Sequence, residues 1–257
     1  MRRVLLLAAA LATIDPAKAG PDPTRDVLWA ALKTCVLAKR YADRAFPCVA
    51  VDLGAPGRPG TAILRAPGER THFVVMPTAT VSGVEAPVLT GPAGAAYWRA
   101  ALAARHLVSD AAREGLAPDD VGLAVNSVGG RSQDQLHIHL ACVQPGVTNA
   151  LQRVADHVGS TWSLLPVRLR GTRFYALRVD AQTLPAFNPF ATLPHLPGRS
   201  MSLRDVSLAM VPLPAGGVVP VGGAAPAGRA RDFALLAYRA PSAHAEKLLD
   251  PGCLAGR

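Results

Sequence analysis

Aromatic residues and long apolar runs are scarce in this sequence. Phe, Trp and Tyr make up 5% of the 257 residues although 50% of the chain is apolar, so we expect a core built mainly of Ala, Val and Leu. No apolar run reaches the roughly 20 residues that a membrane-spanning helix needs. The length accommodates one large domain or two small ones.

Acidic residues are few relative to basic ones. Lys and Arg total 27 against 18 Asp and Glu, which gives a formal net charge of +9. Such an excess favours anionic partners, namely nucleic acid, phosphate esters or acidic lipid. The basic residues are mostly Arg and scattered, without the basic runs and interleaved aromatics of single-strand binders. We therefore expect no nucleic-acid partner. A GC-rich genome would also produce this abundance of Arg, Ala, Gly and Pro.

The sequence also has no C-x-x-C pair, which argues against a zinc ribbon or a thioredoxin-like site. Its four cysteines are Cys35, Cys48, Cys142 and Cys253. An even number in an exported chain predicts two disulfides, with free buried thiols as the alternative. Three pairings are possible. Cys35 and Cys48 are close in sequence and could pair, which would leave Cys142 to hold the chain end through Cys253.

The N-terminus has the layout of a bacterial secretory signal. A basic start, residues 1–3, precedes an apolar run over residues 4–14. Ala17-Lys18-Ala19 then matches a small-x-small cleavage site before Gly20. We expect a signal peptide over residues 1–19, with an uncleaved anchor as the alternative. The protein should then lie at the periplasmic face of the bacterial inner membrane, or in the periplasm if the signal is cleaved.

Hydrophobic periodicity predicts both helices and strands. Helices are expected over residues 26–44, 93–115, 147–158 and 243–249. Strands are expected over residues 48–53, 61–65, 72–76, 121–126, 136–143 and 233–238, with further strand-like stretches in 164–179. Residues 212–230 are rich in Pro, Gly and Ala and indicate a loop. No clear internal repeat is present. This layout predicts an α+β fold with a mainly antiparallel sheet and one long helix.

Residues 126–140 read NSVGGRSQDQLHIHL and hold the most unusual pattern. Alternate side chains of a strand share a face, so His137 and His139 should project together with Gln135. The apolar residues between them should face the core: Leu136, Ile138 and Leu140.

The segment before the histidines is rich in groups that bind phosphate. Asn126, Arg131, Ser132 and Gln133 offer amides, a guanidinium and a hydroxyl, and the glycine pair offers backbone N–H groups. A neutral imidazole beside a phosphate can attack phosphorus, and a second imidazole can donate a proton to a leaving oxygen. This pattern favours phosphate chemistry with a histidine nucleophile.

Two alternatives compete with that interpretation. Both histidines could be buried and satisfied by hydrogen bonds. They could also be two ligands of a metal, with a third ligand from a carboxylate or from His72, His106 or His157. Because no Asp, Glu or Cys has an obvious ligand spacing, we expect no metal and no other cofactor.

The residues 135–140, QLHIHL, resemble the histidine-triad motif, with Gln135 in the first triad position. The strand THFVVMPT, the long helix and the strand VGLAVNS follow in that superfamily's order. Longer strings resemble the bacterial CDP-diacylglycerol pyrophosphatase family: NSVGGRSQDQLHIHLAC, LWAALKTCV, PCVAVDL, VMPTATVSGVEAP and AEKLLDPGC. The similarity covers nearly all of the chain after the signal. Residues 212–230 look lengthened relative to the family, and the N-terminal apolar run is short.

The resemblance implies a histidine-triad-like (HIT-like) catalytic region over residues 20–146 and a C-terminal α+β region over 147–257. It implies a hydrolase that splits the pyrophosphate of CDP-diacylglycerol into CMP and phosphatidate. His137 would attack the α-phosphorus, and His139 would bind the phosphate and assist the leaving group. Five polar residues would bind or position substrate: Asn126, Arg131, Ser132, Gln133 and Gln135.

The expected partner is CDP-diacylglycerol at the membrane surface, and no protein partner is implied. The C-terminal region could shape an exit for the lipid, because residues 184–190 contain apolar side chains that look exposed in the sequence. The motif does not separate this lipid from other nucleotide pyrophosphates. A broader nucleoside-diphosphate hydrolase or nucleotidyl transferase therefore remains the alternative, and a nucleotide- or phosphate-binding protein without catalysis is a third.

Overall fold

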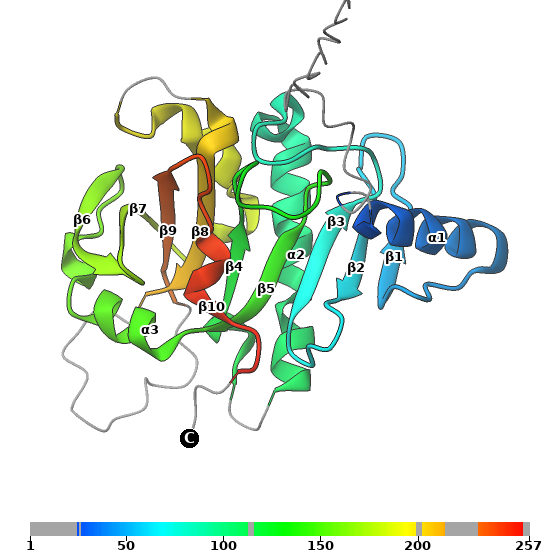
Figure 1. The fold of residues 1–257 in the computed structure, drawn as a ribbon, viewed down its shortest axis with the longest axis horizontal. Helices are drawn as coiled ribbons and strands as arrows, with labels where there is room; N and C mark the ends of the chain where they lie inside the picture. The colour runs from blue at the N-terminus through cyan, green and yellow to red at the C-terminus, as the bar shows by residue number, and fades with distance from the viewer. Residues whose placement is uncertain (1–24, 26, 113–115, 199–201, 214–230, 254–257) are drawn as a thin grey trace, which may run out of the picture.

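An antiparallel sheet organises the protein (Figure 1). The computed structural model describes residues 25, 27–112, 116–198, 202–213 and 231–253. Within them the strand order is β1-β2-β3-β5-β4-β8-β9-β7-β6, and β10 pairs with β5 beside this path. The first five strands are β1 (Ala50–Asp52), β2 (Thr61–Arg65), β3 (Phe73–Pro77), β4 (Val121–Val125) and β5 (Ile138–Val143). The others are β6 (Ser163–Leu169), β7 (Thr172–Val179), β8 (Val206–Pro212), β9 (Phe233–Arg239) and β10 (Leu249–Asp250).

Helices cover both faces of the sheet. The long helix α2 (Pro92–Ala111) lies behind β4 and β5 in Figure 1, where Trp98 and Val108 pack among strand residues such as Leu123. The opposite face is covered in two places. There α1 (Val27–Ala42) packs on β1 to β3, and α3 (Pro145–Gln152) lies with the short 3₁₀ helix η9 (Ala245–Leu248) over the other strands. Shorter 3₁₀ helices connect the strands: η3 (Pro87–Thr90), η4 (Pro118–Asp120), η5 (Ala155–His157), η6 (Leu184–Ala186), η7 (Pro189–His195) and η8 (Leu203–Asp205).

The strand order is nearly symmetric about its centre. Reading outward from the middle, β4-β5-β3-β2 on one side corresponds to β8-β9-β7-β6 on the other. The two halves join where Ala124 of β4 faces Ala209 of β8. The regions 20–146 and 147–257 therefore contribute to the same sheet. The antiparallel sheet and the long helix that the sequence predicted are confirmed.

Two disulfides tie peripheral segments to the sheet. Cys35 of α1 is bonded to Cys48, just before β1, and Cys142 of β5 is bonded to Cys253. Cys142 also pairs with Asp250 of β10 in the sheet, so the second disulfide lies close to the pairing of β10 with β5. Both predicted pairings are confirmed, and they are consistent with an exported protein.

Other sequence expectations have mixed outcomes. The predicted helix over 93–115 is seen as Pro92–Ala111, and the predicted helix over 147–158 ends at Gln152. The expected exposure of the apolar residues in 184–190 is wrong for Leu184 and Phe190, which are buried, and holds for Pro185 and Ala186. Phe190 is 1% exposed and packs edge-on against Trp98 of α2. The signal segment 1–19 and most of the expected loop over 212–230 lie outside the described residues. No helix in the described part of the chain is long and apolar enough to cross a membrane.

Candidate active site

The histidine pair lies at the start of β5, near the centre of the sheet. His139 occupies the face opposite α2, between Val74 of β3 and Ala124 of β4. His137 stands just before the strand begins at Ile138. The alternation places Leu136, Ile138 and Leu140 in the core beneath α2, as the sequence predicted.

The ring of His137 is held by the backbone of its own motif. Its Nδ1 lies 2.7 Å from the carbonyl oxygen of Gln135. Because a carbonyl only accepts hydrogen bonds, Nδ1 must carry the proton, and Nε2 then keeps its lone pair. His137 is 5% exposed, and this burial lowers its pKa from the usual 6.5. The ring is therefore neutral near pH 7, with a free basic nitrogen.

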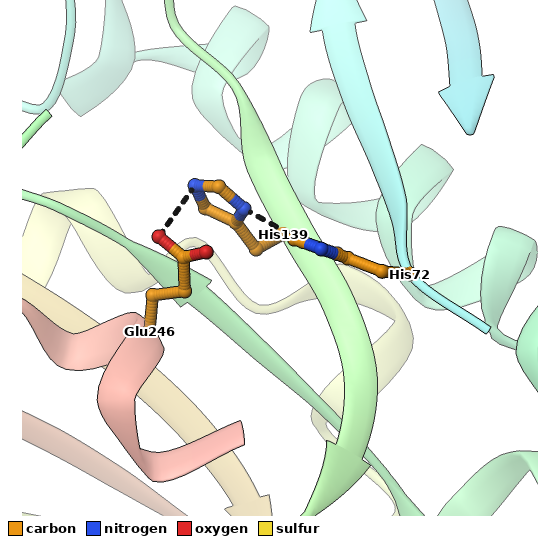
Figure 2. Close-up of side chains that lie close together, drawn as sticks. All are labelled: His72, His139 and Glu246. Atoms are coloured by element: carbon orange, nitrogen blue, oxygen red, sulfur yellow. Dashed lines mark hydrogen bonds and ion pairs between the residues drawn. The ribbon is translucent and has the colours of Figure 1, made fainter. Parts of the chain in front are cut away.

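His139 joins the two sides of the site. Its Nδ1 lies 3.0 Å from Nε2 of His72, which stands just before β3 (Figure 2). On the other side, its Nε2 lies 3.4 Å from Oε2 of Glu246, which is within ion-pair distance. Nε2 makes no hydrogen bond with any described residue. Burial, followed by the neighbouring charges of His137 and His72, holds the pKa of His139 well below its usual value. The ring centroids of His137 and His139 are 4.8 Å apart, so the two imidazoles act in one small volume.

Glu246 reaches this site from the C-terminal segment. Asn126 at the end of β4 holds it twice, since its Nδ2 donates to Oε2 of Glu246 at 2.8 Å and its Oδ1 accepts from the Glu246 backbone N–H at 3.1 Å. Asn126 thus positions a carboxylate rather than standing free beside the histidines.

The glycine pair allows the C-terminal segment to approach closely. A Cβ at Gly129 would lie 2.1 Å from the carbonyl oxygen of Pro241, and one at Gly130 would lie 2.1 Å from that of Ala243. No side chain could be accommodated without moving backbone. The segment that carries Glu246 is therefore seated directly on the loop that precedes the histidines.

Arg131 is bonded to carboxylates. It donates to both oxygens of Glu85, at 2.8 and 2.9 Å, and to Asp134 at 3.1 Å. Burial would raise the pKa of Glu85, but the Arg131 hydrogen bonds and charge outweigh it and leave that pKa lowered. Hydrogen bonds from Arg25, and then from Arg131, lower the pKa of Asp134 to about 2. These pairs make the loop rigid and keep a positive charge near His137.

Two glutamines of the motif form hydrogen bonds to the backbone of neighbouring segments. Gln135 donates to the carbonyl oxygens of Pro77 and Ala79, at 3.0 and 2.8 Å, and accepts from the Val81 N–H at 3.2 Å. Gln133 accepts from the Leu28 N–H, at the start of α1, at 2.9 Å. Gln135 thus secures the segment after β3, and Gln133 secures α1. Ser132 directly precedes Gln133 and is exposed.

Sequence reasoning gave no catalytic role to two residues of this cluster. His72 was considered only as a third metal ligand, although its place in HFVVM, in step with Val74, could have put it on the face of His139. Glu246 lies in the AEKLLDPGC string, and nothing local to it indicates that it reaches β5. Both lie on the rim of a cavity of about 330 Å³ that His244 and Lys247 also line.

His72, His139 and Glu246 could also hold a metal ion. Each offers one ligand atom, and these atoms lie within 4.8 Å of one another. However, the close contact between Nε2 of His72 and Nδ1 of His139 engages both nitrogens in a hydrogen bond. A metal would have to replace that bond, so this remains a geometric alternative.

Comparison with known proteins identifies the family. The model of the CDP-diacylglycerol pyrophosphatase family matches residues 23–257. A "CDP-diacylglycerol pyrophosphatase" of Mycobacterium bovis is 35% identical over 72% of this chain and 70% of its own length. A "Probable CDP-diacylglycerol pyrophosphatase" of Mycobacterium leprae is 34% identical over 82% of this chain and 84% of its own. A "CDP-diacylglycerol pyrophosphatase" of Yersinia pestis is 31% identical over 89% of this chain and 84% of its own length. The chain belongs to the CDP-diacylglycerol pyrophosphatase family.

Proposed function

We propose that this protein hydrolyses the pyrophosphate of CDP-diacylglycerol to CMP and phosphatidate, with His137 as the nucleophile. Family membership and the names of the relatives support the overall reaction. The observation that carries the mechanism is the hydrogen bond from Nδ1 of His137 to the Gln135 carbonyl, which leaves Nε2 unprotonated.

The reaction then proceeds in two displacements. Nε2 of His137 forms a bond to the α-phosphorus while the bond from that phosphorus to the bridging oxygen breaks, and phosphatidate departs. Water then attacks the same phosphorus and breaks the P–N bond, which returns His137 and gives CMP. The lowered pKa of His137 keeps Nε2 unprotonated at neutral pH, as a nucleophile requires.

His139 assists the leaving group in this proposal. If His72 donates from Nε2 to Nδ1 of His139, then the proton of His139 lies on Nε2, which has no hydrogen-bond partner among the described residues. That N–H can donate to the bridging oxygen. Because a departing phosphate monoester has a second pKa of about 6, hydrogen bonding is sufficient and full proton transfer is not needed. The lowered pKa of His139 is therefore compatible with its role.

The polar residues of the motif support the substrate in different ways. The exposed Ser132 hydroxyl is available to bind a phosphate oxygen directly. Asn126 would act through Glu246, and Gln133 and Gln135 through the segments that they hold. Arg131 would contribute its charge from a fixed position.

The fold is consistent with the proposed HIT-like class. The two paired strands β2 and β3, the long helix α2, and the pair β4 and β5 follow in chain order, and β5 carries the histidines. For location, we propose export to the periplasmic side, with residues 1–19 as signal or anchor, since two disulfides suit an oxidising compartment.

Hydrolysis in ¹⁸O-labelled water tests both the reaction and its mechanism. Purified protein should convert CDP-diacylglycerol to CMP and phosphatidate, with the label in CMP and with retained configuration at a chiral α-phosphorus. Label in phosphatidate, or inversion, would overturn the nucleophile assignment. Addition of EDTA should leave the rate unchanged, whereas loss of activity on adding EDTA would favour the metal alternative. Equal specificity constants for CDP-choline and CDP-diacylglycerol would favour a broader nucleotide hydrolase.

A further inference from the structure

Apolar side chains are exposed mainly at one end of the protein. Among the described residues, six of the eight large hydrophobic side chains with high exposure fall within residues 27–53, and Tyr41 and Phe46 are 80% and 82% exposed. We call this set the α1 surface: Val27, Leu37, Tyr41, Phe46, Val49 and Leu53. Figure 1 shows α1 and β1 together at the edge of the sheet, away from the C-terminal half.

Helix α1 borders a hollow as well as an open surface. A groove of about 230 Å³ is lined by Trp29, Leu32, Lys33, Val36, Leu37 and Thr78. Residues 29, 33, 36 and 37 follow helical spacing, so they present one continuous stripe of α1 toward Thr78, just after β3. We call this hollow the α1 groove. Its volume and mainly apolar walls suit a hydrocarbon chain.

Both walls of the α1 groove are bonded to the histidine motif. On one side, Gln133 accepts from the N–H of Leu28 in the first turn of α1. On the other, Gln135 donates to the carbonyl oxygens of Pro77 and Ala79, which flank Thr78. The backbone oxygen of this same Gln135 orients His137. Hydrogen bonds therefore tie the α1 groove to the segment that positions His137.

Positive charge accompanies the exposed apolar residues. Lys33, Arg40 and Arg44 are exposed and make no ion pair within the described part of the chain. Leu37 and Tyr41 lie four residues apart on one side of α1, Lys33 lies one turn before Leu37, and Arg44 follows the end of the helix at Ala42. An apolar strip flanked by cations matches an anionic phospholipid surface, in which basic side chains stay at the headgroups while apolar ones enter the acyl region.

We propose that the α1 surface docks on an anionic phospholipid bilayer and that the α1 groove receives an acyl chain of the substrate. The inference rests on the proposed function for the identity of that substrate. The C-terminal region had been expected to form the lipid exit, but its apolar residues Leu184 and Phe190 are buried. In this arrangement the lipid extends from His137 toward α1, and the pyrophosphate remains at the histidines.

Quenching of Trp29 by lipid tests the docking in the full-length chain. The vesicles contain equal parts phosphatidylglycerol and phosphatidylethanolamine with brominated acyl chains, which quench tryptophan only on contact. We expect the parent protein to be quenched. Trp29→Phe should abolish the quenching, and Trp98 and Trp162 still provide the fluorescence that shows this in the variant. Vesicle affinity should fall about tenfold in Leu37→Glu and in Tyr41→Glu, because each places a charge in the apolar contact. Leu164→Glu, at an exposed apolar site on β6, is the matched control and should bind like the parent protein.

Substrate chain length tests the groove. In Leu37→Glu, kcat/KM for long-chain CDP-diacylglycerol should fall about tenfold more than kcat/KM for a dihexanoyl analogue, because the remote contacts assist positioning. Circular dichroism of each variant confirms its fold. Absence of Trp29 quenching together with an unchanged chain-length preference would overturn the docking proposal, including the case in which residues 1–24 or a second copy cover this surface. Quenching without hydrolysis by the parent protein would instead overturn the proposed function and leave the docking intact.

Discussion

Nε2 of His72 lies 3.0 Å from Nδ1 of His139, although 67 residues separate the two histidines in the chain. The antiparallel register of β3 and β5 brings them together, because Val74 faces His139 and His72 precedes it on the same face of the sheet. The contact with His72 therefore orients the ring of His139, and Glu246 lies near the opposite nitrogen (Figure 2).

The first prediction concerns this pair. His72→Ala should lower kcat about tenfold to a hundredfold, because His139 loses the partner that aligns it. His72→Gln should retain more activity, since its amide N–H can still donate to Nδ1 of His139. In a His139→Ala background, His72→Ala should have little further effect. Additive losses in that double-mutant cycle would show that His72 acts independently of His139.

The second prediction concerns the nucleophile. His137→Ala should lower kcat at least about a thousandfold, because no other group can form the covalent intermediate. Free imidazole should restore part of the activity of His137→Gly. His106→Ala, at an exposed position on α2, serves as the matched control and should keep the parent rate. More than a tenth of the parent rate in His137→Ala, with its thermal unfolding unchanged, would contradict the assignment.

The third prediction concerns the pH dependence of stability. The folded-state pKa values of His137 and His139 lie below their usual 6.5, so the unfolded chain takes up protons in a range where the folded protein does not. Their contribution is complete above pH 6.5 and declines as the pH falls below that value. The free energy of unfolding should therefore drop on acidification. In His139→Gln the slope should be shallower by up to about 1.4 kcal/mol per pH unit.

Urea unfolding at a series of pH values below neutrality measures this slope. His106→Gln controls for the loss of a histidine that is exposed, and it should leave the slope as in the parent protein. A slope that is identical in the parent protein and in His139→Gln would be evidence against a neutral, buried His139.

The fourth prediction concerns Gln135. Its amide makes three hydrogen bonds from a side chain that is 2% exposed, and an imidazole has only two nitrogens to replace them. Gln135→His places a histidine at the first position of the histidine-triad motif that residues 135–140 resemble, but it should destabilise the protein by about 1–3 kcal/mol, because a buried polar group loses its partner. Gln133→His, at the neighbouring glutamine that accepts from the Leu28 N–H, provides the comparison for a histidine placed in the same loop. Chemical denaturation of both variants measures the loss, and an unchanged free energy of unfolding in Gln135→His would contradict the prediction.

The fifth prediction concerns the disulfide of Cys253. Its bond to Cys142 closes 111 residues, whereas that of Cys35 to Cys48 closes 13. In the chain-entropy model, Cys253→Ser should cost about 4–5 kcal/mol and Cys35→Ser about 3 kcal/mol. Cys253→Ser should also lower kcat, because β10 and η9 hold Glu246 beside His139. A variant that loses stability but keeps its full kcat would show that Glu246 stays in place without this bond.

Much of the local structure was predictable from the sequence. Strand β2 was expected at its observed bounds, and the start of α1 and most of α2 follow from apolar spacing that one buried face imposes. Strand β8 was not expected. Its burial is complete along Val206–Pro212, so it lacks the alternation that marks a strand with one solvated face. Strands β3, β4 and β5 are buried as completely and were expected, so full burial makes a strand harder to find but does not hide it.

The sequence by itself determined the motif, its alternation and the pairing of His137 with His139, because these depend on neighbours along one strand. Only the tertiary structure decided what surrounds them. His72 comes from another strand, and Glu246 arrives through the seating of Pro241 and Ala243 on the glycine pair. Strand register and close backbone contact bring together groups that are far apart in the chain, and no local pattern encodes those distances. The same packing buried Phe190 and left Leu37 and Tyr41 of α1 exposed, because burial depends on which elements the folded chain places on top of one another.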